Sequence, residues 1–96
     1  MIQMASVREK IRTFVTDSFF VEGFSDEESF LRTGIVDSMG MSQLVAFLER
    51  EFDIEVLDAE LVPENLDSVA RAATFVDRKR GDERALHDGD SRLTLG

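Results

Sequence analysis

The sequence contains no cysteine, and among its 96 residues it has one histidine, one proline and no tryptophan or tyrosine. The absence of cysteine excludes disulfides, thiolate metal sites and a cysteine nucleophile. A serine nucleophile would have only His87 as its base, and we interpret His87 as a solvated side chain near the end of the chain. We therefore expect no metal site and no independent enzymatic activity.

Basic charge and long apolar runs are also scarce. The formal net charge is -9, which disfavours nucleic acid as a partner because the net field repels phosphates. No stretch of 18 apolar residues occurs, and Met1–Ser6 lacks the basic and apolar segments of a secretory signal. These absences predict a monomeric cytoplasmic protein that does not insert into membranes.

Apolar residues make up 43% of the chain and include eight phenylalanines, enough for the core of one small domain. Helical periodicity extends to about residue 81, whereas residues 82–96 hold charges and single leucines without a period. We therefore predict a helical domain over residues 1–81 and a flexible tail over 82–96.

The first helix is predicted from Ser6 to about Phe20. Ser6 and Glu9 have the spacing of a capping box, in which each side chain accepts a hydrogen bond from the other's backbone N–H. The predicted core stripe consists of Val7, Ile11, Phe14, Val15 and Ser18. Residues 21–37 show no sustained period, so we expect a long loop with one short helical turn at Ser29–Arg32.

Asp37 is a good N-cap for a second long helix, whose stripe is Met41, Leu44, Val45, Leu48 and Phe52. Pro63 suits the first position of a short third helix. Asp67 or Ser68 caps the last helix, and Gly81 is its expected terminator. The sequence therefore predicts an all-α fold, a small four-helix bundle with a long first loop and a short third helix.

Negative charge is concentrated in the middle of the chain. Residues 22–67 hold thirteen acids and two arginines, so we expect the loop and second helix to form an acidic face. Within it, Ser38 lies where the loop meets the helix N-terminus. Asp37 or Ser38 could simply cap the helix, but free amides and the helix dipole also favour an anion there. A modification site fits this serine at least as well as a cap.

Three segments resemble the acyl carrier protein family, which includes peptidyl and aminoacyl carriers. They are Asp37-Ser38-Met39, the following Leu44, Leu48-Glu49 and Phe52, and Pro63-Glu64-Asn65-Leu66-Asp67-Ser68-Val69. The resemblance covers about residues 7–79. It implies that a separate phosphopantetheinyl transferase attaches phosphopantetheine from coenzyme A to Ser38, and that the arm carries an acyl or aminoacyl thioester. The arm's thiol would explain the missing cysteine.

The same resemblance implies that Asp37 helps to engage magnesium and coenzyme at the transferase. It also implies that the second helix docks onto a loading ligase and onto downstream acyl-processing enzymes. By matching position, the docking residues are Met39, Gly40, Ser42, Gln43, Ala46 and Glu49. A bound acyl chain would enter beside this helix, where Phe30, Ile35, Leu44 and Leu61 are the expected lining.

The chain departs from many fatty-acid carriers at Gly40 and Gln43, where those proteins have acids. This departure favours a discrete carrier of a specialised pathway over housekeeping fatty-acid synthesis. The alternative is an unmodified acidic adaptor domain that binds other proteins through the same helix.

Overall fold

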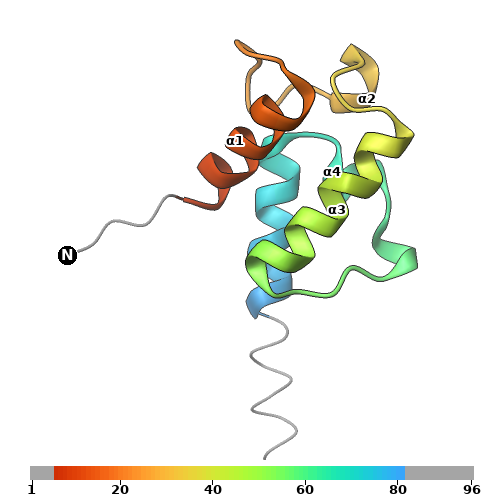
Figure 1. Ribbon diagram of the computed structural model, residues 1–96. Coiled ribbons are helices and arrows are strands. Elements are labelled where there is room, and N and C mark those ends of the chain that lie inside the picture. The colour runs from red at the N-terminus through yellow and green to blue at the C-terminus, as the bar shows by residue number, and fades with distance from the viewer. Residues whose placement is uncertain (1–5, 82–96) are drawn as a thin grey trace, which may run out of the picture.

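The computed structural model describes residues 6–81, and all regular secondary structure in this range is helical. The long elements are α1 (Val7–Phe19), α3 (Ser38–Phe52) and a helix over residues 69–81. The short elements are α2 (Phe30–Thr33), the 3₁₀ turn η1 (Asp58–Glu60) and α4 (Pro63–Leu66). In Figure 1, α3 runs diagonally across the 69–81 helix, and α1 lies beside their upper ends. The predicted all-α fold is confirmed, with α4 as its short third helix.

Helix α1 begins as the sequence predicts. The Ser6 hydroxyl accepts a hydrogen bond from the Glu9 N–H at 3.1 Å, and the Glu9 carboxylate accepts one from the Ser6 N–H at 3.1 Å. Ile11 and Val15 are fully buried, whereas Ser18 is exposed and does not belong to the core stripe. The helix ends at Phe20, whose backbone adopts the left-handed conformation.

The core is formed by apolar side chains from every long helix and from the connecting loops. Its buried members are Ile11, Val15, Phe24, Phe30, Val36, Leu44, Leu48, Phe52, Ile54, Leu66, Val69, Ala72, Ala73, Phe75 and Val76. Helices α1 and α3 meet through Phe14 and Phe47, whose rings stack with centroids 4.3 Å apart. The predicted stripe of α3 is confirmed, since its members are buried or pack against this core.

The long first loop is held in place by hydrogen bonds to the start of the 69–81 helix. The Asp67 carboxylate accepts from the Leu31 N–H at 2.9 Å and from the Ser29 hydroxyl, and the Asp67 carbonyl accepts from the Phe30 N–H at 2.7 Å. Ser29 also caps α2, where the predicted turn starts one residue later than expected. Because α2 is fixed in this way, the chain that enters α3 starts from a defined point.

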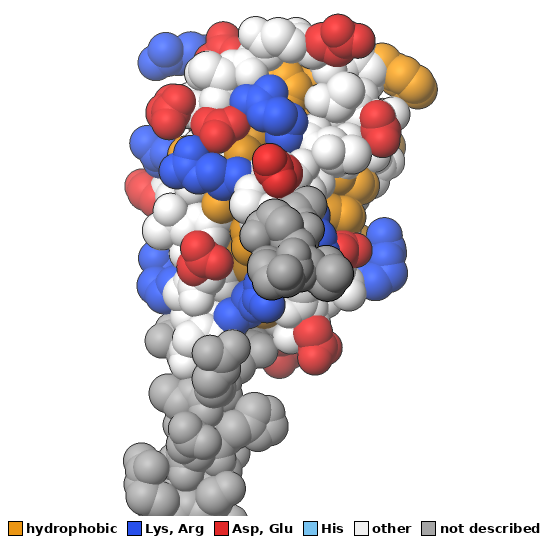
Figure 2. All heavy atoms as spheres, turned by 90° about the vertical axis from the view of Figure 1, so that its left-hand side faces the viewer, with side chains coloured by type: hydrophobic (Ala, Val, Ile, Leu, Met, Phe, Trp, Pro, Cys, Tyr) orange, Lys and Arg blue, Asp and Glu red, His pale blue; other side chains and the backbone are white. Residues whose placement is uncertain are grey.

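Two carboxylates join segments that are distant in sequence. Asp26 pairs with Arg12 and, at 3.0 Å, with Arg8 of α1, and the Arg12 hydrogen bond is the main reason that its pKa lies below the usual value. Glu60 pairs with Lys79 at 3.0 Å. Burial raises the pKa of Glu60, but the hydrogen bond from the Leu57 N–H and the charge of Lys79 outweigh it and lower the pKa overall. Figure 2 shows Lys and Arg side chains interspersed with Asp and Glu on one face.

The last described helix resolves one alternative and corrects one expectation. Ser68 is its cap, because the Ser68 hydroxyl accepts from the Arg71 N–H at 3.0 Å while Asp67 binds the loop. Gly81 is still helical, so it does not terminate the helix at the position we expected. The predicted tail over residues 82–96, with His87, lies outside the described residues. Over residues 6–81, no helix has both the length and the apolar character needed to cross a membrane.

Candidate functional site

Asp37 caps α3, and this leaves Ser38 free. The Asp37 carboxylate accepts a hydrogen bond from the Gly40 N–H at 2.7 Å, and its backbone carbonyl accepts from the Met41 N–H at 2.7 Å. Ser38 is the first residue of the helix and is exposed, and no hydrogen bond to its hydroxyl is found within residues 6–81. The sequence left Asp37 and Ser38 as competing caps, and the structure assigns the cap to Asp37.

The backbone around Ser38 suits a covalently attached phosphate. The first amides of a helix have no partner within it, and here the cap uses only the Gly40 N–H. The N–H groups of Ser38 and Met39 therefore remain at the positive end of the α3 dipole, next to the hydroxyl. These residues fit the phosphate end of a phosphopantetheine group.

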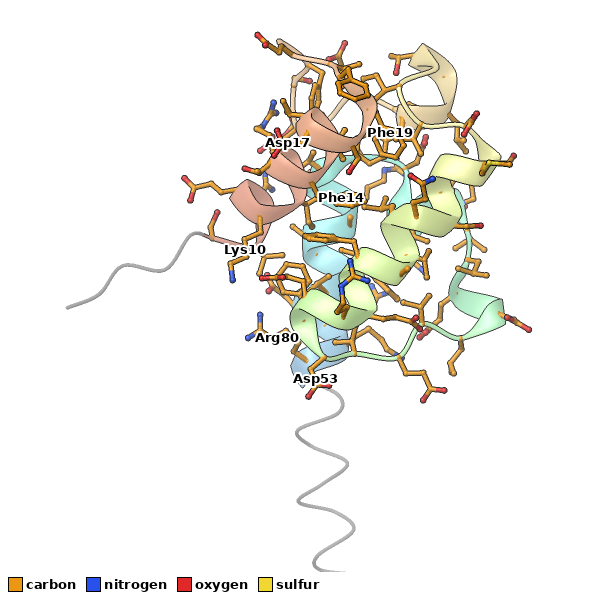
Figure 3. All side chains as sticks on the ribbon, viewed as in Figure 1. Lys10, Phe14, Asp17, Phe19, Asp53 and Arg80 are labelled. Atoms are coloured by element: carbon orange, nitrogen blue, oxygen red, sulfur yellow. The ribbon has the colours of Figure 1, made fainter. Side chains whose placement is uncertain are left out.

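Gly40, one of the expected docking residues, is buried, and its docking role stays a prediction. A Cβ atom at this position would lie 2.8 Å from Phe19 Cε1 and 3.1 Å from Val36 Cγ1. Phe19, labelled in Figure 3, therefore packs where most residues would carry their first side-chain atom. The glycine brings the end of α1 against the first turn of α3.

The other expected docking residues divide into two groups. Met39, Ser42, Gln43 and Ala46 are exposed on α3 and can contact a partner. Glu49 is half-buried, and its carboxylate accepts a hydrogen bond from the Val56 N–H at 2.9 Å. Glu49 thus fixes the segment that follows α3 instead of projecting freely from the helix.

The predicted acidic face does not extend along α3 beside Ser38. Residues 38–48 contain no charged side chain, and the acids of α3 lie in its last turns. Several acids elsewhere in the region are engaged by cations, such as Asp26 with Arg12 and Glu60 with Lys79. The exposed part of α3 that follows Ser38 is uncharged as far as residue 48, whereas Asp37, directly before Ser38, is an exposed acid.

The expected acyl-chain lining is not an open cavity. Phe30 and Leu44 are fully buried, Ile35 is half-buried and Leu61 is exposed. Two surface clefts of about 630 and 440 Å³ are lined by other residues, the second between α1 and α3. A chain beside α3 would have to displace packed side chains, and its entry there stays a prediction.

Sequence reasoning missed the part played by the end of α1. Phe19 and Phe20 follow the predicted stripe without belonging to it, and nothing in their spacing indicates a contact with α3. The one available signal was Gly40, because a glycine inside a helical pattern often marks a close approach.

No protein-family model matches the chain. Curated relatives span most of it: the acyl carrier protein of Solidesulfovibrio magneticus is 25% identical over 79 residues, which cover 80% of this chain and 99% of the relative. The acyl carrier proteins of two strains of Buchnera aphidicola are each 28% identical over 78 residues, covering 79% of this chain and 95% of the relative. The chain is thus similar to acyl carrier proteins over about four fifths of its length. The match covers these relatives almost end to end, and the all-helical fold agrees with it.

Within residues 6–81 no group of three His, Cys, Asp or Glu side chains could hold a metal ion. Ser38 is the residue that the acyl carrier resemblance singles out, and it lies at the exposed junction described above.

Proposed function

We propose that the protein is a discrete carrier that holds an acyl or aminoacyl group on a phosphopantetheine arm attached to Ser38. One observation carries the proposal: Asp37 caps α3, so the exposed Ser38 hydroxyl has no structural task. The sequence similarity to acyl carrier proteins supports the same reading.

The chain's own residues would receive and hold the arm. The Ser38 hydroxyl accepts the phosphoryl group, and the first amides of α3 stabilise its negative charge. Asp37 keeps the helix start ordered through the Gly40 N–H, whether or not Ser38 is modified. The attached group supplies the thiol that forms the thioester, which the cysteine-free chain itself lacks.

The carrier is not an enzyme and would depend on partner enzymes in the cytoplasm. These are a phosphopantetheinyl transferase, an acyl- or aminoacyl-loading ligase and downstream acyl-processing enzymes. The exposed residues of α3 are the proposed docking surface, namely Met39, Ser42, Gln43 and Ala46. Because this surface is uncharged, we expect the partners to belong to a specialised pathway.

Mass spectrometry tests the proposal. The chain is incubated with coenzyme A and a broad-specificity phosphopantetheinyl transferase, and the wild type should gain one phosphopantetheine group. Ser38→Ala should gain none and keep its melting temperature, since Asp37 still caps α3. Ser42→Ala is the matched control, one turn further along the helix, and should be modified like the wild type.

Two results would contradict the proposal. Modification of Ser38→Ala would show that another residue is the attachment site. An unchanged wild-type mass with a transferase that modifies other carriers would favour the unmodified adaptor.

A further inference from the structure

The position of the Ser38 hydroxyl depends on the backbone at either side, because no hydrogen bond to this hydroxyl is found within residues 6–81. On one side, Asp37 caps α3 through the Gly40 N–H at 2.7 Å. On the other side, the four residues 34–37 join Ser38 to α2, which lies above the upper end of α3 in Figure 1. The place of α2 therefore affects the place of the hydroxyl that would be modified.

Val36 anchors this short link to both helices. Its N–H donates to the Phe30 carbonyl of α2 at 3.2 Å. Its side chain is fully buried, and Cγ1 lies 3.1 Å from where a Gly40 Cβ would be, against the first turn of α3. A shift of Phe30 would therefore move Val36, and with it the start of the helix on which Ser38 lies.

Asp67 holds α2 from its other side. The Asp67 carboxylate accepts from the Leu31 N–H at 2.9 Å and from the Ser29 hydroxyl, which is also the cap of α2. The Asp67 carbonyl accepts from the Phe30 N–H at 2.7 Å. A helix of four residues is not stable on its own in water, so α2 depends on such contacts for its position.

The helix that follows Asp67 does not need its carboxylate. Ser68 caps that helix, since the Ser68 hydroxyl accepts from the Arg71 N–H at 3.0 Å. The hydrogen bond from the Phe30 N–H uses the backbone carbonyl at position 67, so it does not depend on the side chain either. Replacement of the Asp67 side chain therefore acts on the two bonds to Ser29 and Leu31.

We propose that Asp67 is a positioning residue for the modification of Ser38. Its carboxylate fixes α2, α2 fixes Val36, and Val36 holds the start of α3 so that the Ser38 hydroxyl is presented in one orientation to the transferase. Asp67 acts through Phe30 and Val36, without contact to the arm. The inference rests on the proposed function.

The test compares Asp67→Ala with Asp67→Asn in the full chain, at saturating coenzyme A and with a phosphopantetheinyl transferase that modifies the wild type. Alanine removes the acceptor of both side-chain hydrogen bonds, whereas asparagine keeps an oxygen that can accept from the Leu31 N–H. The kcat for Asp67→Ala should fall about tenfold at unchanged KM, because misplacement of a reacting group slows the chemical step. Asp67→Asn should recover most of the wild-type kcat.

Amide hydrogen exchange reports the same change without the transferase. The Val36 N–H should exchange about tenfold faster in Asp67→Ala, because the loss of a hydrogen bond to a charged group favours local opening of α2 by about that factor. In Asp67→Asn the exchange of Val36 should stay close to that of the wild type.

A loss of folded protein alone would give a different kinetic pattern. The remaining folded molecules would react normally, so the apparent KM for the carrier would rise and kcat would stay unchanged. Asp26→Asn is the matched control, because Asp26 joins the same loop to α1 through Arg8 and Arg12 but lies before α2. It should lower the melting temperature and leave kcat unchanged.

A wild-type kcat in Asp67→Ala would overturn the inference while leaving Ser38 as the site. So would a raised KM at unchanged kcat, or an equal fall of kcat in Asp26→Asn. If Asp67→Ala does not fold, Ser29→Ala removes one of the two bonds and should also lower kcat; a wild-type kcat there would overturn the inference as well. Failure of the wild type to be modified at all would reject the proposed function itself.

Discussion

Replacement of Gly40 by alanine changes the stability of the fold in two opposite ways, through helix propensity and through packing. In an exposed helix the change would stabilise the fold by about 1 kcal/mol, because glycine loses more backbone entropy on folding. At this site the added methyl group would lie 2.8 Å from Phe19 Cε1 and 3.1 Å from Phe19 Cζ. Real carbon atoms do not approach so closely, so the Phe19 ring or the helix must move.

The ring of Phe19 cannot move freely. It packs against the core and meets Phe14 edge to face, with centroids 6.0 Å apart. Inserting a methyl group into a packed site costs about 1–3 kcal/mol. Subtracting the gain in propensity leaves a net destabilisation of about 1 kcal/mol, or a fall in melting temperature of about 4–8 °C for a domain of this size.

A double-mutant cycle, followed by urea unfolding and far-ultraviolet circular dichroism, isolates this contact. Phe19→Leu removes the ring atoms nearest to the added methyl group, so Gly40→Ala should stabilise the Phe19→Leu protein by about 0.5–1 kcal/mol. Ser42→Ala, on the exposed side of the same helix, reports the effect of propensity alone. If Gly40→Ala stabilises both backgrounds equally, the close approach of α1 to α3 does not constrain position 40.

Three further outcomes follow from the other contacts. Asp26 and Glu60 have pKa values in the folded protein below their ordinary values of 3.8 and 4.5. The stability that each carboxylate contributes is therefore present at a pH above its ordinary pKa and is lost as the pH falls through its pKa in the folded protein. Asp26→Asn should therefore lower the melting temperature at pH 7 but have little effect at pH 2.5, and a constant difference would contradict this. Asp67→Ala should accelerate amide hydrogen exchange in residues 29–34 more than in α1, because it removes the carboxylate that accepts the loop's hydrogen bonds. Equal acceleration in both segments would show that these hydrogen bonds do not stabilise the loop separately. A chain ending at Gly81 should be modified at Ser38 as fast as the full chain and melt within a few degrees of it; a larger fall would show that residues 82–96 stabilise the domain.

Much of the fold could be predicted because its signals are local. Ser6 and Glu9 mark the start of α1 within a single turn, and the stripe from Met41 to Phe52 orients α3 without reference to the rest of the chain. The choice between Asp67 and Ser68 as a cap could not be made in this way. Ser68 is the cap because Asp67 bonds to Leu31, 36 residues away, and a local pattern holds no information about that partner.

In the candidate site, too, local features could be predicted from the sequence and long-range contacts could not. Asp37 and Ser38 could be found from the sequence and from the family resemblance, because adjacent residues indicate where the loop ends and the helix begins. The burial of Gly40 could not be predicted, because it depends on Phe19, which comes from another helix. The hydrogen bond that the Glu49 carboxylate accepts from the Val56 N–H could not be predicted for a similar reason, because Val56 lies beyond the end of α3.

These long-range contacts change how the surface around Ser38 can be recognised. An acidic strip would attract basic partners from a distance, and its strength would fall with salt. Here residues 38–48 carry no charge, Asp26 and Glu60 are paired with Arg12 and Lys79, and the first turn of α3 presents an exposed methionine and a glycine covered by Phe19. A partner that contacts α3 beyond Ser38 would meet uncharged side chains, so we expect its binding there to depend on shape and apolar contact more than on salt.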